Sequence, residues 1–437
     1  MRQKIINTFR YHMHRALKNL QLWSPNWQGC TWISLSLILA LSPTLSAQSI
    51  DELVSILQQE SPILKALEWQ YLAAAEQAPQ VSQLPQPEFG IGAFISPVET
   101  RLGAQQARFS VGQMFPWFGT LEGKAQLMQT RAQVQREQIG DKALALNYRL
   151  KTAYLQLYEF RQAQLILERK RQLLERLRQL TLSQIESGSG SGADVLRVEL
   201  ELQALEQEIR ILQKQEERPM ATINHLLKRP LQQAIQTPDT LSFATLRIHS
   251  DTLRQALLTN HPRLRGLQLE QAVAQQAMVV NKMEGKPSFG LGADYILLGA
   301  RSDADPIRNG RDIFQVSAKV SIPIYRKKYE AKEKEERLKI EALNFQQEAV
   351  VQDFLSVIDQ AITTHEEAAL RISLYQQQIE TTRSASRFIQ ASYANSGGRF
   401  DELLQLEQDL IRYDLQIMKA IVKSHLAKAS IERYIQF

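Results

Sequence analysis

Long stretches of this chain place apolar residues three and four positions apart, which is the spacing of an α-helix that buries one side. In the first half these stretches cover about residues 50–83, 121–186 and 194–228. In the longest of them the apolar positions include Leu146, Leu150, Ala153, Leu157 and Phe160. This spacing predicts helices that pack along narrow seams, as in coiled coils.

The same order returns in the second half, with helical stretches before residue 285, over about 326–394 and after residue 401. The last of these carries Leu403, Leu406, Leu410, Tyr413 and Ile417 on one side. In each half the two shorter helical stretches add up to nearly the length of the long one. The lengths therefore predict two short helices stacked end to end beside one helix of about 100 Å.

Four shorter segments alternate apolar and polar residues and predict strands over about 87–96, 107–116, 287–298 and 312–323. In the third segment Phe289, Leu291 and Tyr295 fall on one face, opposite Gly290 and Asp294. Such alternation fits an ordinary half-buried sheet. Strands of about ten residues are also typical of a transmembrane barrel that is apolar outside and polar inside.

The two halves are related by an internal repeat. Four pairs of short motifs recur, the first two at an offset of 200 residues and the last two at 207. The pairs are Ser61-Pro62-Ile63-Leu64 with His261-Pro262-Arg263-Leu264, segment 87–93 with 287–293, segment 115–118 with 322–325, and Asp194 and Leu196 with Asp401 and Leu403. The repeat predicts a first unit over 48–237, a linker over 238–250 and a second unit over 251–437.

Residues 1–47 differ from the rest of the chain. They contain five basic side chains, no acidic one, an apolar run over about 31–45 and the small pair Ser46-Ala47. This pattern predicts a secretory signal peptide that is cleaved after Ala47. A membrane anchor is the alternative, but an apolar run of about 15 residues is short for a membrane span.

Composition supports an exported chain without catalytic chemistry. The net charge of +6 belongs almost entirely to residues 1–47, which also contain the single cysteine, Cys30. A mature chain near neutrality argues against nucleic-acid binding. The turn Gly188-Ser189-Gly190-Ser191-Gly192 lacks the Lys and Ser/Thr of a phosphate-binding loop, and the histidines are scattered. We therefore expect no catalytic residue, no cofactor and no metal site.

If the strands cross a membrane, their backbone groups must all be hydrogen-bonded, which requires a closed barrel. No segment of the mature chain is apolar enough for a spanning helix, so a barrel is the only transmembrane option. One chain supplies four predicted strands, whereas known barrels have at least about eight. The chain must then oligomerise; three copies give twelve strands, and counting alone leaves two copies open.

The order of helix, hairpin, long helix, glycine turn and helix, repeated twice, resembles the outer-membrane efflux proteins of the TolC family. The matching segments are 257–265, which opens the second unit, strand segment 289–295, and the turn from Gly188 to Leu196. The likeness spans essentially the whole mature chain. It implies a mainly α fold with a transmembrane β-barrel contribution, in which a homotrimer forms a 12-stranded barrel in outer-membrane lipid, continuous with an α-helical tunnel in the periplasm.

The resemblance also implies a function. It indicates the exit duct of a tripartite efflux or type I secretion system, which receives substrate from an inner-membrane pump (RND or ABC type) through a periplasmic adaptor protein. Segment 115–119 followed by Lys124 is similar to the metal-efflux (Cus/Czc-type) members. Export of heavy-metal cations is therefore the alternative, and a soluble periplasmic coiled-coil scaffold is the remaining one.

The resemblance places the duct's aperture at two turns, 187–194 and 395–401, which we call the tip turns. Asp401 matches an acid that narrows the aperture, and Leu404 stands where the family has a second acid. Asp194 matches a position that bonds across the closed tip, with Arg399 as a candidate partner. The candidate adaptor-contacting residues are Gly188, Gly190, Gly192, Leu196, Gly397, Gly398 and Leu403.

Elementary chemistry suggests simpler roles for some of these residues. Glycines permit the positive φ values of a tight reversal, and both Asp194 and Asp401 could cap the helices that follow. Three copies of Asp401 around an opening would favour cations. Aromatic residues where strand becomes helix fit either a membrane-interface belt or core packing at a bend; they are Phe115, Trp117, Phe118 and Tyr325.

Overall fold

The computed structural model describes residues 49–188, 190–246, 257, 259–396 and 399–435, all within one unit, Ala47–Phe437. The predicted signal peptide lies outside the described residues. The helices are α2 (Ile50–Glu60), α3 (Pro62–Ala75), α4 (Gln77–Val81), α5 (Thr120–Glu186), α6 (Gly192–Leu226), α8 (Pro262–Glu284), α9 (Lys327–Ser396) and α10 (Phe400–Glu432). The strands are β1 (Glu88–Ala93), β2 (Glu99–Thr100), β3 (Gly103–Phe115), β4 (Ser288–Gly299) and β5 (Ile313–Ser321).

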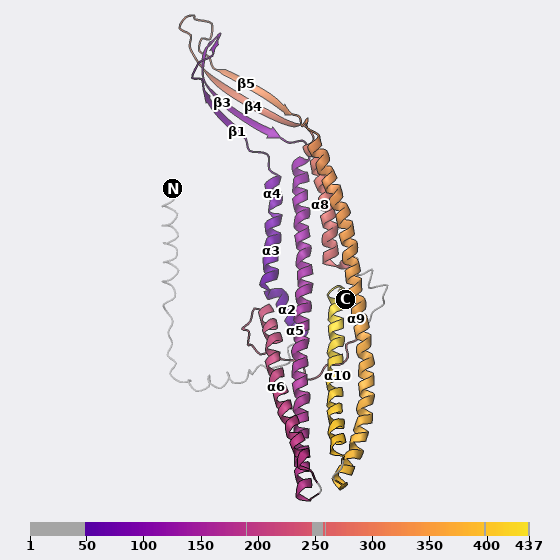
Figure 1. Ribbon diagram of the computed structural model, residues 1–437. Coiled ribbons are helices and arrows are strands. Elements are labelled where there is room, and N and C mark those ends of the chain that lie inside the picture. The colour runs from indigo at the N-terminus through magenta and orange to yellow at the C-terminus, as the bar shows by residue number, and fades with distance from the viewer. Residues whose placement is uncertain (1–48, 189, 247–256, 258, 397–398, 436–437) are drawn as a thin grey trace, which may run out of the picture. The chain divides into compact units, whose positions relative to one another are not determined.

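Two very long helices organise the structure. Helix α5 has 67 residues and α9 has 70, so each is about 100 Å long at the usual rise per residue. Helices α3 and α6 lie one after the other along α5, while α8 and α10 lie along α9 (Figure 1). Helix α5 also contacts α8 and α10 of the second half. The stacking of two short helices beside one long helix, predicted from the lengths, is confirmed.

The buried residues of α5 form the predicted seams. Leu146, Leu150, Ala153 and Leu157 belong to a cluster with Leu53 and Leu57 of α2 and with Ile223 of α6. Further along, Leu174 and Leu177 join a second cluster with Val198 and Leu205 of α6 and with residues of α9 and α10. Because apolar positions recur every three or four residues, one side of each helix is buried and the other side stays polar.

The predicted helical stretch over 50–83 is broken in the structure. Ser61 has φ −60° and ψ 118°, which ends α2 and precedes α3. Pro62 causes this, because its ring disfavours the helical conformation in the residue before it. Pro62 itself occupies the first position of α3, where its missing N–H costs nothing. A single continuous helix over 50–83 was therefore the wrong prediction.

The strands form one antiparallel sheet in the order β1-β3-β4-β5, with the short β2 paired to β3. The sheet joins the two halves of the chain through the β3–β4 pair. Strand β3 begins at Gly103, earlier than the predicted 107. Residues 103–105 pair with β2 and β4 although they show no apolar alternation. Gly103 has φ 133°, and a side chain there would meet the Gly299 carbonyl oxygen at 1.8 Å, so only glycine fits.

Residues 229–246 cross the helices without forming a helix or strand. This stretch, the linker segment, comprises the end of the first predicted unit and the start of the predicted linker. Side chains of α5, α6, α9 and α10 hold it by hydrogen bonds to its backbone. The bonds are Asn224 Nδ2 to the Leu231 and Gln233 carbonyls (2.9 and 2.8 Å), Leu241 N to Tyr158 Oη (2.9 Å), Ala244 N to Ser424 Oγ (3.1 Å), and the Nε2 atoms of His365 and His425 to the Ala244 and Ser242 carbonyls (2.6 and 2.8 Å). The linker therefore ties both halves together near mid-length.

None of the helices in the described part of the chain combines the length and the hydropathy that a membrane crossing requires.

Replacing Leu150 tests the seam. Leu150 is fully buried in α5, so Leu150→Ala should lower the free energy of unfolding by about 2–5 kcal/mol through lost burial and a residual cavity. Leu165→Ala is the matched control, because Leu165 is about half exposed on the same helix; its effect should stay within about 0.5 kcal/mol. Thermal unfolding followed by circular dichroism measures both, and equal effects would contradict the predicted seam.

Candidate functional site

The first tip turn reverses the chain between α5 and α6. Gly188 has φ 77°, and a side chain at Gly190 would come within 2.7 Å of the Ile185 backbone nitrogen, so both positions require glycine. Ser191 has an extended backbone, and its hydroxyl accepts a hydrogen bond from the Ala193 N–H (3.2 Å). Ser191 is therefore the cap of α6. The expectation that Asp194 caps this helix is wrong, because Asp194 lies within its first turn.

The second tip turn precedes α10. Gly397 and Gly398 lie outside the described residues. Arg399 has φ 69° and stands before the helix without a side-chain capping bond. Asp401 lies in the first turn of α10 and is 68% exposed at its side chain. Its expected role as a helix cap is also wrong, since the capping position belongs to Arg399.

Arg197 connects the two tip turns. Its guanidinium forms an ion pair with the Asp401 carboxylate, joining α6 to α10, and its Nη1 lies 3.8 Å from Oδ1 of Asp194. The sequence did not single out Arg197. The available signal was its position three residues after Asp194, which places both side chains on one side of a helix.

Asp194 and Tyr393 occupy poorly solvated positions beside this ion pair. Burial raises the pKa of Asp194; the Arg197 charge opposes this and the Asp401 charge adds to it. Tyr393 is 0% exposed, and its hydroxyl has no hydrogen-bond partner within the described part of the chain. Burial also raises the pKa of Tyr393, and the Asp194 charge adds to the effect. The carboxylates of Asp194 and Asp401 thus share one positive partner, the Arg197 guanidinium.

The remaining tip candidates have other environments. Arg399 bonds to Glu402 (Nε to Oε1, 3.0 Å; Nη2 to Oε2, 2.6 Å) instead of Asp194. Leu403 and Leu404 are both buried in the cluster that contains Val198. Leu196 is exposed, as a contact for another protein would be. Roles at an aperture or an adaptor contact stay predictions for all of them.

The aromatic candidates lie where β3 leads into α5 and where β5 leads towards α9. Phe118 is 81% exposed and Tyr325 is 82% exposed, so neither belongs to a core of this chain. Trp117 is partly buried, with its ring centroid 6.0 Å from those of Phe118 and Phe289. Phe115 pairs with Phe289 in the sheet. Core packing therefore fits Phe115 and Trp117 only in part, and it does not fit the other two.

Among the residues that the structure describes, no three His, Cys, Asp or Glu side chains are grouped so that they could hold a metal ion.

The arrangement of helices and sheet is that of known outer-membrane channels. The outer-membrane channel OprN matches with a TM-score of 0.71 at 19% identity, over 88% of this chain and 89% of OprN. CusC matches with a TM-score of 0.74 at 14% identity, over 94% of this chain and 98% of CusC. The open state of the Neisseria gonorrhoeae channel MtrE matches with a TM-score of 0.67 at 14% identity, over 88% of each chain.

No protein-family model and no curated protein matches the chain. At these identities the matches show the fold, and at that level the resemblance to the TolC family is confirmed. The chain is mainly helical with one sheet, arranged as in TolC-like channels.

Arg197→Ala tests the connection between the tip turns. An exposed ion pair is worth only about 0–1 kcal/mol, so the melting temperature should change little. The first turns of α6 and α10 should nevertheless exchange their amide hydrogens faster, since their connection is lost. Lys214→Ala is the control, because Lys214 pairs with Glu217 inside α6. Equal amide exchange in wild type and Arg197→Ala would show that Arg197 does not stabilise the contact between the first turns of α6 and α10.

The raised pKa of Asp194 predicts a pH dependence of stability. The folded chain keeps this proton to higher pH than the unfolded chain does, so the stabilisation is present at low pH and is lost as the pH rises through the folded pKa. Asp194→Asn stays uncharged, and its melting temperature should fall less than that of wild type between about pH 4 and pH 7. Asp359→Asn, an exposed acid on α9, is the control; parallel pH curves for wild type and Asp194→Asn would contradict the prediction.

Proposed function

We propose that the chain is one subunit of an outer-membrane exit duct, with its sheet in a transmembrane barrel and its helices in a periplasmic tunnel. The observation that carries this proposal is the sheet, which exposes one apolar face and presents a polar face on its other side. A soluble scaffold would bury such an apolar face, because large exposed apolar patches mark interaction sites. The likeness of this chain in fold to outer-membrane channels supports the same conclusion.

The apolar face consists of aligned rows across all four long strands. In one row Ile91 pairs with Phe109, Phe109 with Tyr295, and Tyr295 with Phe314. The next row is Phe89, Val111, Ala293 and Val316. Ile91 is 83% exposed, and the other large side chains of both rows are exposed as well. Lipid tails would cover these rows, whose one polar side-chain group, the Tyr295 hydroxyl, donates to Asp312 Oδ2 (2.6 Å).

The opposite face is mostly small and polar, although Ile296, which pairs with Arg108, and Leu298 also lie on it. Ser110 pairs with Asp294, Gly112 with Gly292, and Gly292 with Ser317. Asp294 is 5% exposed and forms an ion pair with Arg108, with Oδ1 2.9 Å from Nη2. A face of serines, glycines and a compensated charge suits the water-filled inside of a barrel.

The sheet cannot stand alone in lipid. In the described part of the chain β1 and β5 are its two edges, and unpaired backbone groups cost several kcal/mol each in a bilayer. Pairing of β5 in one copy with β1 in the next removes every edge. Three copies then form a 12-stranded barrel, which makes the homotrimer the proposed assembly.

The other candidates take roles that follow from this orientation. The exposed rings of Phe118 and Tyr325 lie at the helix side of the apolar rows, where a bilayer meets the periplasm. The tip turns, at the far ends of α5 and α9, are the proposed contact for a periplasmic adaptor and an inner-membrane pump, with Leu196 and the tip glycines in the interface. We propose passage of solutes and no enzymatic activity.

Two substrate classes remain for this duct. The pump that feeds the duct would select organic compounds or a secreted protein in one case and copper, silver or zinc-group cations in the other. The likeness of segment 115–119 and Lys124 to metal-efflux members favours testing the second class directly. A strain that lacks this chain separates the two classes. Its sensitivity to metal salts is compared with its sensitivity to dyes and antibiotics.

The duct is tested with the purified full chain. It should fractionate with the outer membrane as a heat-sensitive oligomer and conduct ions in planar bilayers; a water-soluble monomer would disprove the proposal. Asp401→Ala should raise the single-channel conductance, because the ion pair with Arg197 that joins α6 to α10 is lost. It should also weaken block by divalent cations severalfold, because negative charge at the constriction is lost. Glu380→Ala, an exposed acid on α9 away from the tip turns, should leave the record unchanged; identical records for all three proteins would remove Asp401 from the aperture.

A further inference from the structure

Three connections between sheet and helices meet at one cavity. They lead from β3 to α5, from α8 to β4 and from β5 to α9. The cavity has a volume of about 370 Å³. Its lining includes Thr120, Lys124, Lys286, Ser288, Ser321 and Lys328. Residues far apart in the sequence thus place hydroxyl groups and three ammonium groups around one space.

The cavity lies on the polar side of the sheet. Of the strand residues that line it, Ser288 pairs with Ser321. Their neighbours along the strands, Phe289 and Val320, pair with each other and point to the exposed apolar face. Successive side chains of a strand point to opposite sides. The cavity therefore faces water, away from the surface that lipid would cover.

Positive charge dominates the cavity. Lys124 is compensated by an ion pair with Glu284 (2.7 Å). Lys286 and Lys328 are exposed, and neither forms an ion pair with another described residue. Lys328 Nζ lies 5.0 Å from the centroid of the Tyr329 ring. Two ammonium groups are consequently left for a ligand of opposite charge.

Thr120 supplies a second, independent sign of a missing ligand. It is the first residue of α5 and is 3% exposed, and its hydroxyl has no hydrogen-bond partner among the described residues. The preceding Gly119 has no side chain to cap the helix. The Thr120 N–H already donates to the Trp117 carbonyl (3.0 Å), so the helix start contributes its partial positive charge. A buried donor without an acceptor is costly, and an oxyanion would satisfy it.

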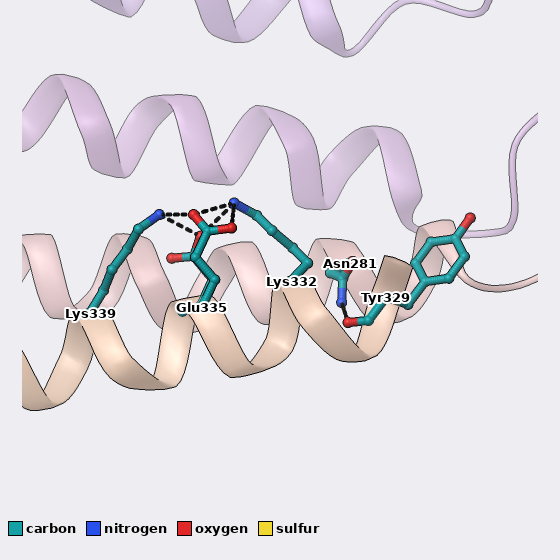
Figure 2. A network of polar contacts seen from close by, with 6 residues as sticks. Asn281, Tyr329, Lys332, Glu335 and Lys339 are labelled. Carbon is teal, nitrogen blue, oxygen red and sulfur yellow. Dashed lines mark hydrogen bonds and ion pairs between the residues drawn. The ribbon is translucent and has the colours of Figure 1, made fainter. Parts of the chain in front are cut away.

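The lysines are held in place by the connections around them. Arg326 donates from Nη1 to the Gly285 carbonyl (2.8 Å), which joins the start of α9 to the end of α8. Asn281 donates to the Tyr329 carbonyl (2.8 Å), as Figure 2 shows. The same view shows Lys332 and Lys339, one and three turns further along α9, both engaged by Glu335. Lys328 has no such acid and stays available.

We propose that this cavity binds a soluble oxyanion of the phosphate class. Lys286 and Lys328 provide the charge, the partial positive charge at the start of α5 adds to it, and the Thr120 hydroxyl provides a hydrogen-bond donor. A lipid headgroup has the same chemistry, but the polar side of the sheet is the wrong side for it. Binding needs only the folded chain; a ring of three such sites inside the duct rests on the proposed function.

Equilibrium dialysis of the full chain in detergent with radiolabelled orthophosphate tests the site. Wild type should bind saturably, and Lys286→Ala/Lys328→Ala should weaken binding about tenfold or more, since a charged hydrogen bond is lost at each lysine. Glu284→Gln should strengthen binding, because it removes the competing carboxylate. Thr120→Val should weaken binding without lowering the melting temperature. Lys327→Ala, an exposed neighbour outside the lining, is the matched control.

The binding measurements test the site independently of the proposed duct. Equal phosphate affinity in wild type and Lys286→Ala/Lys328→Ala overturns the proposal, as does weaker binding in Glu284→Gln. Vesicles of phosphatidylglycerol and of phosphatidylcholine form the second arm. Lysine-dependent binding to the anionic vesicles, without binding of orthophosphate, also overturns it and assigns the cavity to lipid. Phosphate binding by a protein that fails to conduct would leave the site standing and reject the duct.

Discussion

The whole structure depends on the packing of one long helix, α5, against the shorter helices around it. Helix α5 contacts α2, α3, α4, α6, α8 and α10, so nearly every other helix buries its apolar side against it. In a folded protein most of the stability of a helix comes from burial of its apolar side, and α5 offers 67 residues for such contacts. Its seams, around Leu150 and around Leu174, fix the positions of the short helices. The positions of the tip turn and of β3 then follow from the two ends of α5.

At the Thr120 end of α5 the direction in which apolar side chains point changes between helices and strands. The helices bury their apolar side within the chain, whereas the strands of the sheet turn Phe89, Ile91 and Phe314 outward. The change occurs within the few residues between Phe115 and Thr120 and between Ser321 and Lys327. Polar and charged groups from three connections have to converge there. The cavity proposed to bind an oxyanion lies at this change of packing.

Most of the secondary structure could be predicted because the sequence patterns are long and their boundaries are chemically marked. The end of α5 at Glu186 coincides with the glycine turn, and the strands coincide with alternation. Three features escaped this reasoning. The break at Ser61 depends on a single proline, the pairing at Gly103 has no alternation, and the Arg197–Asp401 ion pair joins residues that only the tertiary structure brings together.

The capping roles of Asp194 and Asp401 failed for a related reason. An aspartate near a helix start is a common cap, but the backbone selects the capping residue by its conformation. Ser191 and Arg399 occupy those conformations, at φ −107° and 69°. The aspartates were thereby left free to face one arginine between two helices. The capping roles were wrong because a cap depends on a boundary being known to within one residue, whereas the roles of Asp194 and Asp401 at an aperture stay predictions.

The linker segment holds helices α9 and α10 at one point along their length, so a small rotation there would move their far ends much further. His365, His425 and Ser424 fasten α9 and α10 to residues 242–244. From His365 to the end of α9 is about 47 Å of helix. A pivot of roughly five degrees at the linker would therefore move the far end of α9 by about 4 Å. The hydrogen bonds to residues 242–244 thus fix the point about which the far part of α9 would rotate.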